Sequence, residues 1–232
     1  MTPATIPGAA TNLTVTGGNA QATLSWSAPA SNGGASITTY TVTSTPTGAS
    51  CTTAALTCHF TGLTNGTSYT LSVVARNAIG TGPATTSSVT PATTPGAPLN
   101  VTATDGNATA TVLWSPPITS GGSVITGYTV SSVPAGFTCT VTTTSCTFSG
   151  LTNGTRYTFS VVATNAVGDG LPGTGSVTPA TVPTAPTNVT AVGGNATAIV
   201  TWSPPTSDGG AALTSYVVSS VPSGHSLSLI HI

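Results

Sequence analysis

Charge is almost absent from this chain. Of its 232 residues, two are Arg and three are Asp, and there is no Lys and no Glu. The charged residues are Arg76, Arg156, Asp105, Asp169 and Asp208. An average globular chain is about a quarter charged. With a net charge of −1, the chain has no basic surface for nucleic acid and no polybasic patch for anionic lipid, so we expect neither as a partner.

Long apolar runs are also missing. No window approaches the roughly 18 consecutive apolar residues that a transmembrane helix needs, so we expect no membrane span. The abundant residues are 52 Thr, 27 Ser and 27 Gly, which together make up nearly half of the chain. Helix formers are scarce, whereas Thr and Val favour strands. The composition therefore predicts an all-β protein.

The sequence repeats itself with a period of 88 residues and no insertion. Whole segments recur, such as LTNGTSYT at 63–70 and LTNGTRYT at 151–158, and the linker-like TPAT begins at 2, 90 and 178. Aromatic residues and cysteines keep the same spacing: Trp26, Trp114 and Trp202; Tyr40, Tyr128 and Tyr216; Cys51 and Cys139; Cys58 and Cys146. A unit of this length is the size of a small autonomous domain, so we expect a tandem array.

Within one repeat, short alternating runs are separated by turn residues. Apolar side chains alternate with polar ones at 13–15, 22–26, 40–42 and 69–75, and a period of two places each set on one face of a sheet. Turns are marked by Asn32-Gly33-Gly34 and Asn65-Gly66. Short strands at such regular spacing are typical of a β-sandwich. Pro91, Pro95 and Pro98 indicate a short, stiff junction between two repeats.

These motifs resemble the fibronectin type III domain, in the Thr- and Gly-rich style common in bacterial extracellular proteins. The resemblance rests on LSW at 24–26, ITTYTV at 37–42, GLTNGTSY at 62–69 and VARNAIGTGP at 74–83, each with a counterpart one period later. It covers essentially the whole chain. It implies tandem immunoglobulin-like (fibronectin type III) β-sandwiches, two complete and one truncated. In this family a leucine and a tyrosine lock the corner between the fifth and sixth strands; Leu63 with Tyr69, and Leu151 with Tyr157, match them.

The resemblance also implies the domain boundaries and the core. We expect the end of a preceding repeat at 1–5, complete domains at 6–94 and 95–182, and a truncated domain at 183–226. The recurring aromatic and leucine side chains fall on inward positions and are expected in the core: Trp26, Tyr40, Leu63, Tyr69, Trp114, Tyr128, Leu151, Tyr157, Trp202 and Tyr216. The Trp side chains are therefore core residues rather than platforms for sugar stacking.

The repeat runs to the first residue at one end of the sequence and breaks down at the other. Met1 aligns with Val89 and Val177, and we hypothesise that it marks a valine codon used as a start, with further repeats before it. The missing signal peptide then says nothing about export. At the other end Leu227 replaces the expected cysteine, and residues 227–232 read LSLIHI. These six residues match a translated sequencing adapter, and we hypothesise read-through of such an adapter.

One pair of cysteines occurs in each complete repeat, Cys51 with Cys58 and Cys139 with Cys146. We expect two disulfides formed in an oxidising compartment, each closed across a short hairpin. Free thiols and a metal site that includes His59 are the alternatives. Zinc wants four ligands, and repeat two has no histidine near its cysteines, so a metal is disfavoured.

The sequence indicates no catalytic site, no metal site and no cofactor. The three Asp fall in loops of different repeats, and no Ser-His-Asp set or carboxylate pair is evident. By the family topology, Asp105, Arg156 and Asp208 lie in loops that face the second junction and would bias its angle. The simpler alternative, which we favour, is three solvated charges worth at most about 1 kcal/mol. Seven N-x-S/T triplets, including those at Asn65 and Asn153, are expected by chance in a chain so rich in Asn and Thr.

The loops at one pole are where binding members of this family make contacts. They span 30–36, 119–123 and 207–211, together with 77–83 and 165–172. They lack the Tyr, Trp or Arg anchors of good binding loops and contain no Arg-Gly-Asp. We therefore expect a non-enzymatic structural spacer in a secreted or cell-surface bacterial protein, with neighbouring modules of the same longer chain as partners. The alternative is an adhesion or carbohydrate-binding accessory module that contacts glycan or host matrix.

Overall fold

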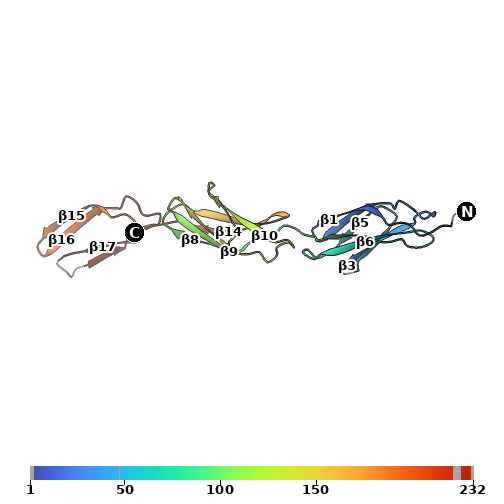
Figure 1. Ribbon diagram of the computed structural model, residues 1–232. Helices are drawn as coiled ribbons and strands as arrows, with labels where there is room; N and C mark the ends of the chain where they lie inside the picture. The colour runs from blue at the N-terminus through green and yellow to red at the C-terminus, as the bar shows by residue number, and fades with distance from the viewer. Residues whose placement is uncertain (1–2, 47, 222–225, 231–232) are drawn as a thin grey trace. The chain divides into compact units, whose positions relative to one another are not determined.

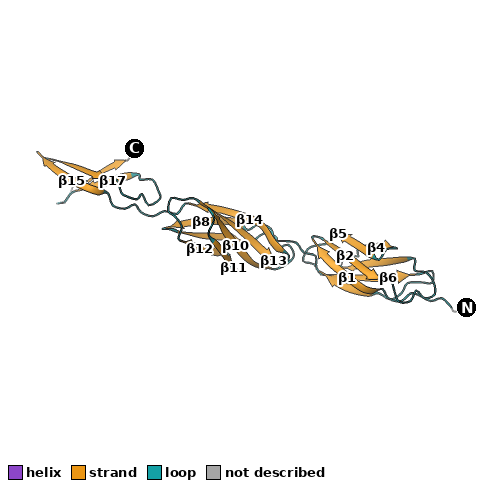
Figure 2. Ribbon diagram, turned by 90° about the horizontal axis from the view of Figure 1, so that it is seen from above, coloured by secondary structure: helices purple, strands orange, loops and turns teal. Residues whose placement is uncertain are grey.

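The computed structural model describes residues 3–46, 48–221 and 226–230, and over these residues the protein consists of strands, turns and loops (Figure 2). The first repeat contains seven strands. They are β1 (Thr11–Gly18), β2 (Gln21–Ser27), β3 (Thr39–Thr45), β4 (Ser50–Thr53), β5 (Thr57–Thr61), β6 (Tyr69–Arg76) and β7 (Thr85–Val89). Figure 1 shows them in blue to cyan.

These strands form two antiparallel sheets, ordered β1-β2-β5 and β4-β3-β6-β7. The alternating sequence sets which side chains lie between the sheets. Leu24 lies opposite Cys58 across β2 and β5, and Val42 lies opposite Val73 across β3 and β6; all four are inward positions. Thr85 Oγ1 of β7 donates to the Ala10 carbonyl beside β1 at 2.6 Å, so it joins one edge of the sandwich.

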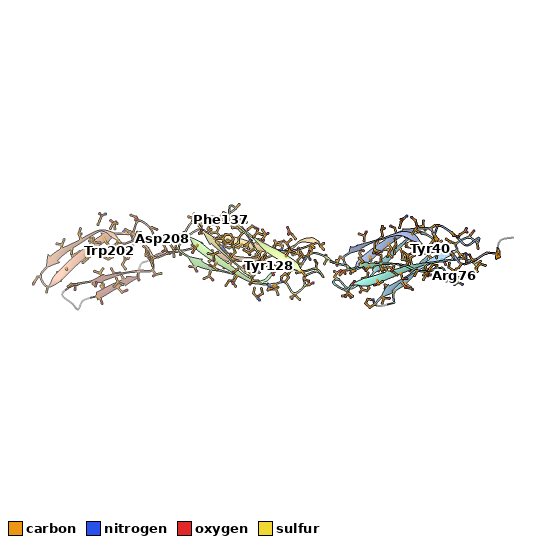
Figure 3. The ribbon with its side chains drawn as sticks, in the orientation of Figure 1. Tyr40, Arg76, Tyr128, Phe137, Trp202 and Asp208 are labelled. Carbon is orange, nitrogen blue, oxygen red and sulfur yellow. A yellow bond between two sulfur atoms is a disulfide. The ribbon has the colours of Figure 1, made fainter. Side chains whose placement is uncertain are left out.

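The core of repeat one contains the residues expected from the sequence. Trp26 and Tyr40 contact each other with ring centroids 5.5 Å apart, and Tyr40 is labelled in Figure 3. The buried set is Ala10, Ala22, Leu24, Trp26, Tyr40, Val42, Cys58, Phe60, Leu63, Tyr69, Leu71, Val73 and Ala75. The predicted fold class, a tandem all-β sandwich, is confirmed.

Repeat two has the same architecture. Its strands are β8 (Leu99–Gly106), β9 (Thr109–Ser115), β10 (Ile125–Val133), β11 (Thr138–Val141), β12 (Ser145–Ser149), β13 (Tyr157–Asn165) and β14 (Gly168–Val177). They form sheets ordered β12-β9-β8 and β11-β10-β13-β14. Trp114 packs against Tyr128 at 5.5 Å, and Phe148 stacks on Phe159 at 4.7 Å. Trp114, Tyr128, Leu151 and Tyr157 are all buried.

Both cysteine pairs form disulfides, Cys51–Cys58 and Cys139–Cys146. The prediction that each pair lies within one hairpin is wrong. Cys51 lies on β4 and Cys58 on β5, and these strands belong to different sheets. Because the chain crosses from one sheet to the other between them, each disulfide joins the edges of two sheets.

The third repeat has two sheets of two strands each within the described residues. Its strands are β15 (Thr187–Gly194), β16 (Thr197–Ser203), β17 (Ser215–Ser219) and β18 (Ser226–Ile230). Leu227 lies opposite Val218, where Cys139 lies opposite Val130 in repeat two. Met1 and residues 231–232, on which the hypotheses about the chain ends partly rest, lie outside the described residues.

The expectation that Trp202 and Tyr216 are core residues needs correction. They contact each other at 5.4 Å, as their counterparts do, but both are only half-buried. Trp26 and Trp114 are 5% exposed because β5 and β6, or β12 and β13, complete the sheets that enclose them. No strand of this kind covers Trp202 among the described residues (Figure 3).

Candidate functional site: the linker anchors

The TPAT motif is held at its proline by the repeat that precedes it. The backbone N–H of Gly66 donates to the Pro91 carbonyl at 2.9 Å, and Gly154 donates to Pro179 at the same distance. Both glycines have a φ of +81°, a conformation that glycine adopts without penalty. Pro91 is fully buried. The first half of the linker is therefore part of the preceding sandwich.

Asn65 fixes the corner that carries this donor. Its Oδ1 accepts from the Ala20 backbone N–H at 2.8 Å, and its Nδ2 donates to Asn19 Oδ1 at 2.8 Å. Asn153 makes the same two hydrogen bonds, to Ala108 and Asn107, in repeat two. The amide thus joins the β1–β2 turn to the β5–β6 corner. The N-x-S/T triplets that begin at Asn65 and Asn153 therefore have a structural role.

The tyrosine of the corner behaves as the family resemblance implied. The Thr64 backbone N–H donates to the Tyr69 hydroxyl at 3.0 Å, and Thr152 donates to Tyr157 at 3.2 Å. Leu63 is buried beneath this corner. Apolar burial and a hydrogen bond therefore fix the loop that holds the linker proline.

The threonine that ends TPAT is held by the repeat that follows. Its backbone N–H donates to a glycine carbonyl in the β2–β3 loop or its counterpart. The pairs are Thr5 with Gly33 at 2.7 Å, Thr93 with Gly121 at 2.8 Å and Thr181 with Gly209 at 2.8 Å. A second backbone hydrogen bond follows three residues later, from Gly8, Gly96 or Thr184 to Ser31, Thr119 or Ser207. The second half of the linker is therefore part of the following repeat.

Asn165 adds a side-chain latch to the second anchor. Its Nδ2 donates to the Thr93 carbonyl and to the Ser120 carbonyl, each at 2.8 Å. Its Oδ1 accepts from the backbone N–H groups of Val167 and Gly168 at 2.8 and 3.2 Å. Asn165 is 4% exposed, and its four hydrogen bonds are part-buried. One buried amide thus ties the linker, the β9–β10 loop and the β13–β14 turn together.

Asn77 makes the equivalent latch in repeat one. Its Nδ2 donates to the Thr5 carbonyl at 2.7 Å and the Asn32 carbonyl at 2.9 Å. Sequence reasoning missed both asparagines, although they are one period apart within the recurring N-A-[IV]-G segment. Only the fold shows that these two asparagines, at the end of β13 and just after β6, are buried and face the linker.

Glycine is required at the seat of the linker. Gly121 has a φ of +74°, and a Cβ built on it would overlap the Thr93 carbonyl oxygen. A Cβ at Gly33 or Gly209 would likewise overlap the carbonyl oxygen of Thr5 or Thr181. The paired glycines were predicted as turn residues, and the structure adds that they admit the linker backbone.

The two anchors leave one residue between them. The Pro91 carbonyl is bound to repeat one, and the Thr93 N–H and carbonyl are bound to repeat two. Ala92 alone lies between these two positions. Ala180 has the same place between Pro179 and Thr181. The protein's own linker is therefore hydrogen-bonded to two of the loops at this pole, through Gly121 and Asn165 in repeat two.

Two of the three charged residues predicted at the second junction make hydrogen bonds within their own repeat. Arg156 Nη2 donates to Ser176 Oγ at 2.9 Å, and Asp208 Oδ1 accepts from the Gly210 backbone N–H at 2.8 Å. The expectation that all three Asp lie in loops is wrong for two of them, because Asp105 is exposed on β8 and Asp169 lies on β14. Asp208 lies in a loop and is labelled in Figure 3. A role for these charges between domains stays a prediction.

The metal alternative at His59 finds no support in the geometry. His59 points outward from β5 and its Nδ1 contacts Thr23 Oγ1 at 2.9 Å, whereas Cys58 points inward and is disulfide-bonded. Among the described residues no three His, Cys, Asp or Glu side chains gather as metal ligands. The same part of the chain has no helix that is long and apolar enough to cross a membrane.

Burial raises the pKa of the Tyr40 and Tyr128 hydroxyls above the usual 10.0.

Comparison with known proteins gives the class of protein. The model of the fibronectin type III domain matches residues 8–91 and 96–179, which is well over half of the chain. The chain therefore belongs to the fibronectin type III family, with two such domains in tandem.

Two curated proteins are similar to parts of this chain. Chitinase A1 of Niallia circulans is 36% identical over 180 residues, which cover 72% of this chain and 24% of the chitinase. The Kelch domain-containing protein SSO1033 of Saccharolobus solfataricus is 37% identical over 128 residues, which cover 52% of this chain and 17% of that protein. The chain thus spans a quarter or less of the length of these relatives.

Proposed function

We propose that this chain is a non-catalytic spacer segment of a secreted or cell-surface bacterial protein. The observation that carries the proposal is the linker Pro91-Ala92-Thr93, whose first and last residues are each hydrogen-bonded to a different repeat. A linker with one residue between two anchors has few backbone torsions left to vary. Such a junction limits the relative motion of the modules it joins, which is what a spacer needs.

The surface supports the same role. The outward side chains of β1, β2 and β5 are mostly Thr and Ser, as in the pair Thr14 Oγ1 and Ser25 Oγ at 2.7 Å. Such hydroxyls pair with one another and with water, and they present little apolar area to a partner. With two Arg and no Lys, the chain also offers few sites to proteases that cleave after basic residues. The two disulfides are typical of proteins in oxidising, extracellular compartments.

A second candidate is an accessory module of a polysaccharide-degrading enzyme. The similarity to Chitinase A1 over most of this chain favours it. The two candidates differ in one respect, because an accessory module would contact the polysaccharide itself. A spacer within such an enzyme would not.

The proposal is tested by sedimenting the full chain with insoluble chitin and cellulose, and by measuring its small-angle X-ray scattering. We expect no retention on either polysaccharide. We also expect the distribution of distances derived from the scattering to broaden when six Gly and Ser residues are inserted after Ala92. Retention on chitin would favour the accessory module. Scattering that is unchanged by the insertion would contradict the spacer, because the native junction would then be as free as a flexible linker.

A further inference from the structure

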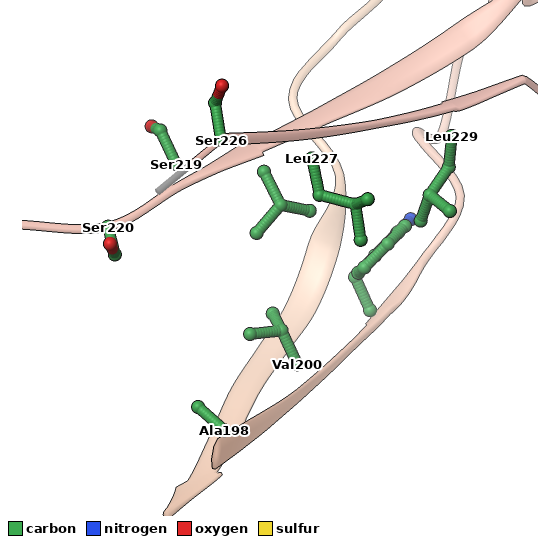
Figure 4. Close-up of a pocket in the computed structure, with 9 residues that line it drawn as sticks. Ala198, Val200, Ser219, Ser220, Ser226, Leu227 and Leu229 are labelled. Carbon is green, nitrogen blue, oxygen red and sulfur yellow. The ribbon is translucent and has the colours of Figure 1, made fainter. Parts of the chain in front are cut away.

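Chemically reactive groups are few in the described part of this chain. The cysteines are bound in two disulfides. The hollow between the two sheets of repeat three is lined by apolar side chains and serines (Figure 4), with no acid or base among them. Three Asn-Gly steps, at Asn32, Asn65 and Asn153, are reactive in another way. The carboxamide of Asn is an electrophile, and the backbone nitrogen of a following Gly attacks it readily because no Cβ hinders the approach.

Asn65 and Asn153 are protected from this reaction by their hydrogen bonds. In each carboxamide Oδ1 accepts a hydrogen bond and Nδ2 donates one, all at 2.8 Å. The nitrogen that would attack is bound as well, because the Gly66 N–H donates to the Pro91 carbonyl at 2.9 Å, with an equivalent bond from Gly154. The reaction at either step therefore requires three hydrogen bonds to open first.

The carboxamide of Asn32, in the β2–β3 loop, has different surroundings. Asn32 is exposed, and among the described residues its carboxamide makes a single hydrogen bond, in which the Gly34 N–H donates to Oδ1 at 2.9 Å. This bond closes a ring that contains the peptide bond between Asn32 and Gly33, so the carboxamide stays beside the nitrogen that attacks it. The same N–H stabilises the negative charge that develops on Oδ1 during the attack.

The attacking nitrogen of Gly33 is bound to a group that transfers protons. Its N–H donates to Ser31 Oγ at 3.2 Å, and Ser31 is exposed. A hydroxyl in contact with water can accept the proton that Gly33 loses and pass one on to the solvent. The carbonyl that binds the Gly66 N–H has no proton to pass on. The Asn32 step thus combines a polarised carboxamide with a route for the proton.

We propose that Asn32 is a site of intramolecular deamidation. The Gly33 nitrogen forms a bond to Cγ of Asn32, the bond from Cγ to Nδ2 breaks, and ammonia leaves with a proton equivalent to the one that Gly33 loses. Water then adds to either carbonyl of the succinimide ring and opens it, to an aspartate or to an isoaspartate. The reaction involves no oxidant or reductant, and water is the co-reactant. This inference does not depend on the spacer role.

The aspartate product fits the native loop. By the 88-residue period, Asp208 occupies this place in repeat three. Its Oδ1 accepts from the Gly210 N–H at 2.8 Å, and the linker bond from Thr181 to the Gly209 carbonyl is present there at 2.8 Å. A carboxylate at this position is therefore compatible with a seated linker.

The isoaspartate product does not fit the native loop. It adds a methylene group to the main chain before Gly33, whose carbonyl accepts from the Thr5 N–H at 2.7 Å. It also turns the Asn32 carbonyl, which accepts from Asn77 Nδ2 at 2.9 Å, into a free carboxylate. We expect this product to loosen the anchor of the linker on repeat one.

The test follows the native full chain during incubation in mildly alkaline buffer. Peptide mapping by mass spectrometry with electron-transfer fragmentation measures Asn, Asp and isoaspartate at each Asn-Gly step. We expect conversion at Asn32 to be at least about tenfold faster than at Asn65 or Asn153, where hydrogen bonds must open first. The control is the same chain reduced and unfolded in urea, in which all three steps should convert at similar rates. Equal rates at the three steps of the native chain would overturn the proposal, as would an intact Asn32 in the native chain after the unfolded chain has converted.

A matched pair of variants tests the hydroxyl beside Gly33. Ser31→Thr keeps it, as Thr119 does in repeat two, where Oγ1 accepts from the Gly121 N–H at 3.1 Å. Ser31→Ala removes it and leaves Asn32 in an exposed loop. We expect conversion at Asn32 to slow severalfold in the Ala variant and to stay near the native rate in the Thr variant. Equal rates in the two variants would overturn the role of Ser31.

The effect on the linker anchor is measured as amide exchange at Thr5. We expect faster exchange in the isoaspartyl form, separated chromatographically from the incubated chain. Asn32→Asp is the matched control, because it adds the same charge without lengthening the main chain, and its exchange at Thr5 should equal that of the native chain. Unchanged exchange in the isoaspartyl form would overturn the link between this site and the anchor.

Discussion

Repeats two and three share most of their local sequence and differ in how deeply the core tryptophan is buried and in the side-chain hydrogen bonds to the linker. Both keep the Trp–Tyr contact, at 5.5 and 5.4 Å, and both hold the linker threonine to a glycine carbonyl at 2.8 Å. Trp114 is 5% exposed, whereas Trp202 is only half-buried. Asn165 latches the Thr93 carbonyl, and the described part of repeat three includes no counterpart of this asparagine.

The difference distinguishes structural features that depend on local sequence from features that depend on the complete sandwich. Turns, strand pairs and backbone anchors form from residues that are close in the chain. The dry core and the buried latch need strands that come later in the same repeat. We therefore expect the latch, which ties the Thr93 carbonyl to repeat two, to restrict the first junction.

The largest expected effect concerns the core tryptophans. Trp114→Ala should lower the free energy of unfolding of repeat two by roughly 3–5 kcal/mol, because it opens a cavity in a packed core. Trp202→Ala should have a much smaller effect, because its site is already open. Hydrogen exchange measured by mass spectrometry resolves the repeats separately. Equal losses in the two repeats would contradict the difference in packing.

Removal of a disulfide should have the next largest effect. Replacing Cys139 and Cys146 together by Ser should destabilise repeat two by about 2–3 kcal/mol, since a short closed loop restricts the unfolded chain. The unfolding of repeat one should not change, because it has its own Cys51–Cys58 bond. Chemical denaturation followed by hydrogen exchange checks both parts. A loss in both repeats from the one double substitution would show that they do not unfold independently.

Removing the latch should have a smaller effect on stability and a specific effect on the junction. Asn165→Ala leaves two carbonyls and two N–H groups without this partner, and we expect a loss of about 1–3 kcal/mol. Asn77→Ala is the matched control, because it removes the same four hydrogen bonds around Thr5 and leaves Thr93 held. Amide exchange at Thr93 should increase only in the Asn165 variant. Increased exchange in both would show that the latch is not local.

The smallest effect is the response to pH. Burial raises the pKa of Tyr40 and Tyr128 above the usual 10.0. The stability that follows from this shift is present below pH 10 and is lost as the pH rises through the raised value. The midpoint temperature of thermal unfolding should therefore be nearly constant between about pH 5 and 9 and should decline above about pH 10. Tyr128→Phe should remove part of the alkaline decline in repeat two, and a decline that begins near neutral pH would contradict this explanation.

The sequence predicts the strands and the core well, because both follow from periodicity. Alternation places Leu24 and Trp26 inward, and the 88-residue period transfers the assignment to repeat two. The disulfide partners were also predictable, but not the crossing between sheets, because a short spacing fits a hairpin equally well. The latch was not predictable from Asn165 alone. Its four hydrogen bonds join residues that are up to 72 positions apart, and a polar residue in a Gly-rich loop is ordinarily exposed.

The central claim is that anchors on both sides of Ala92, completed by Asn165, restrict the first junction. Pulsed electron–electron double resonance tests it with spin labels attached to ketone-bearing residues, which leave the disulfides intact. One pair replaces Thr16 and Thr104, and the other replaces Thr104 and Val192; these exposed positions are one period apart. We predict a narrow distance distribution for the first pair, which Asn165→Ala broadens, and a distribution for the second pair that Asn165→Ala leaves unchanged. A broad distribution for the first pair, or one that Asn165→Ala leaves unchanged, would contradict the claim.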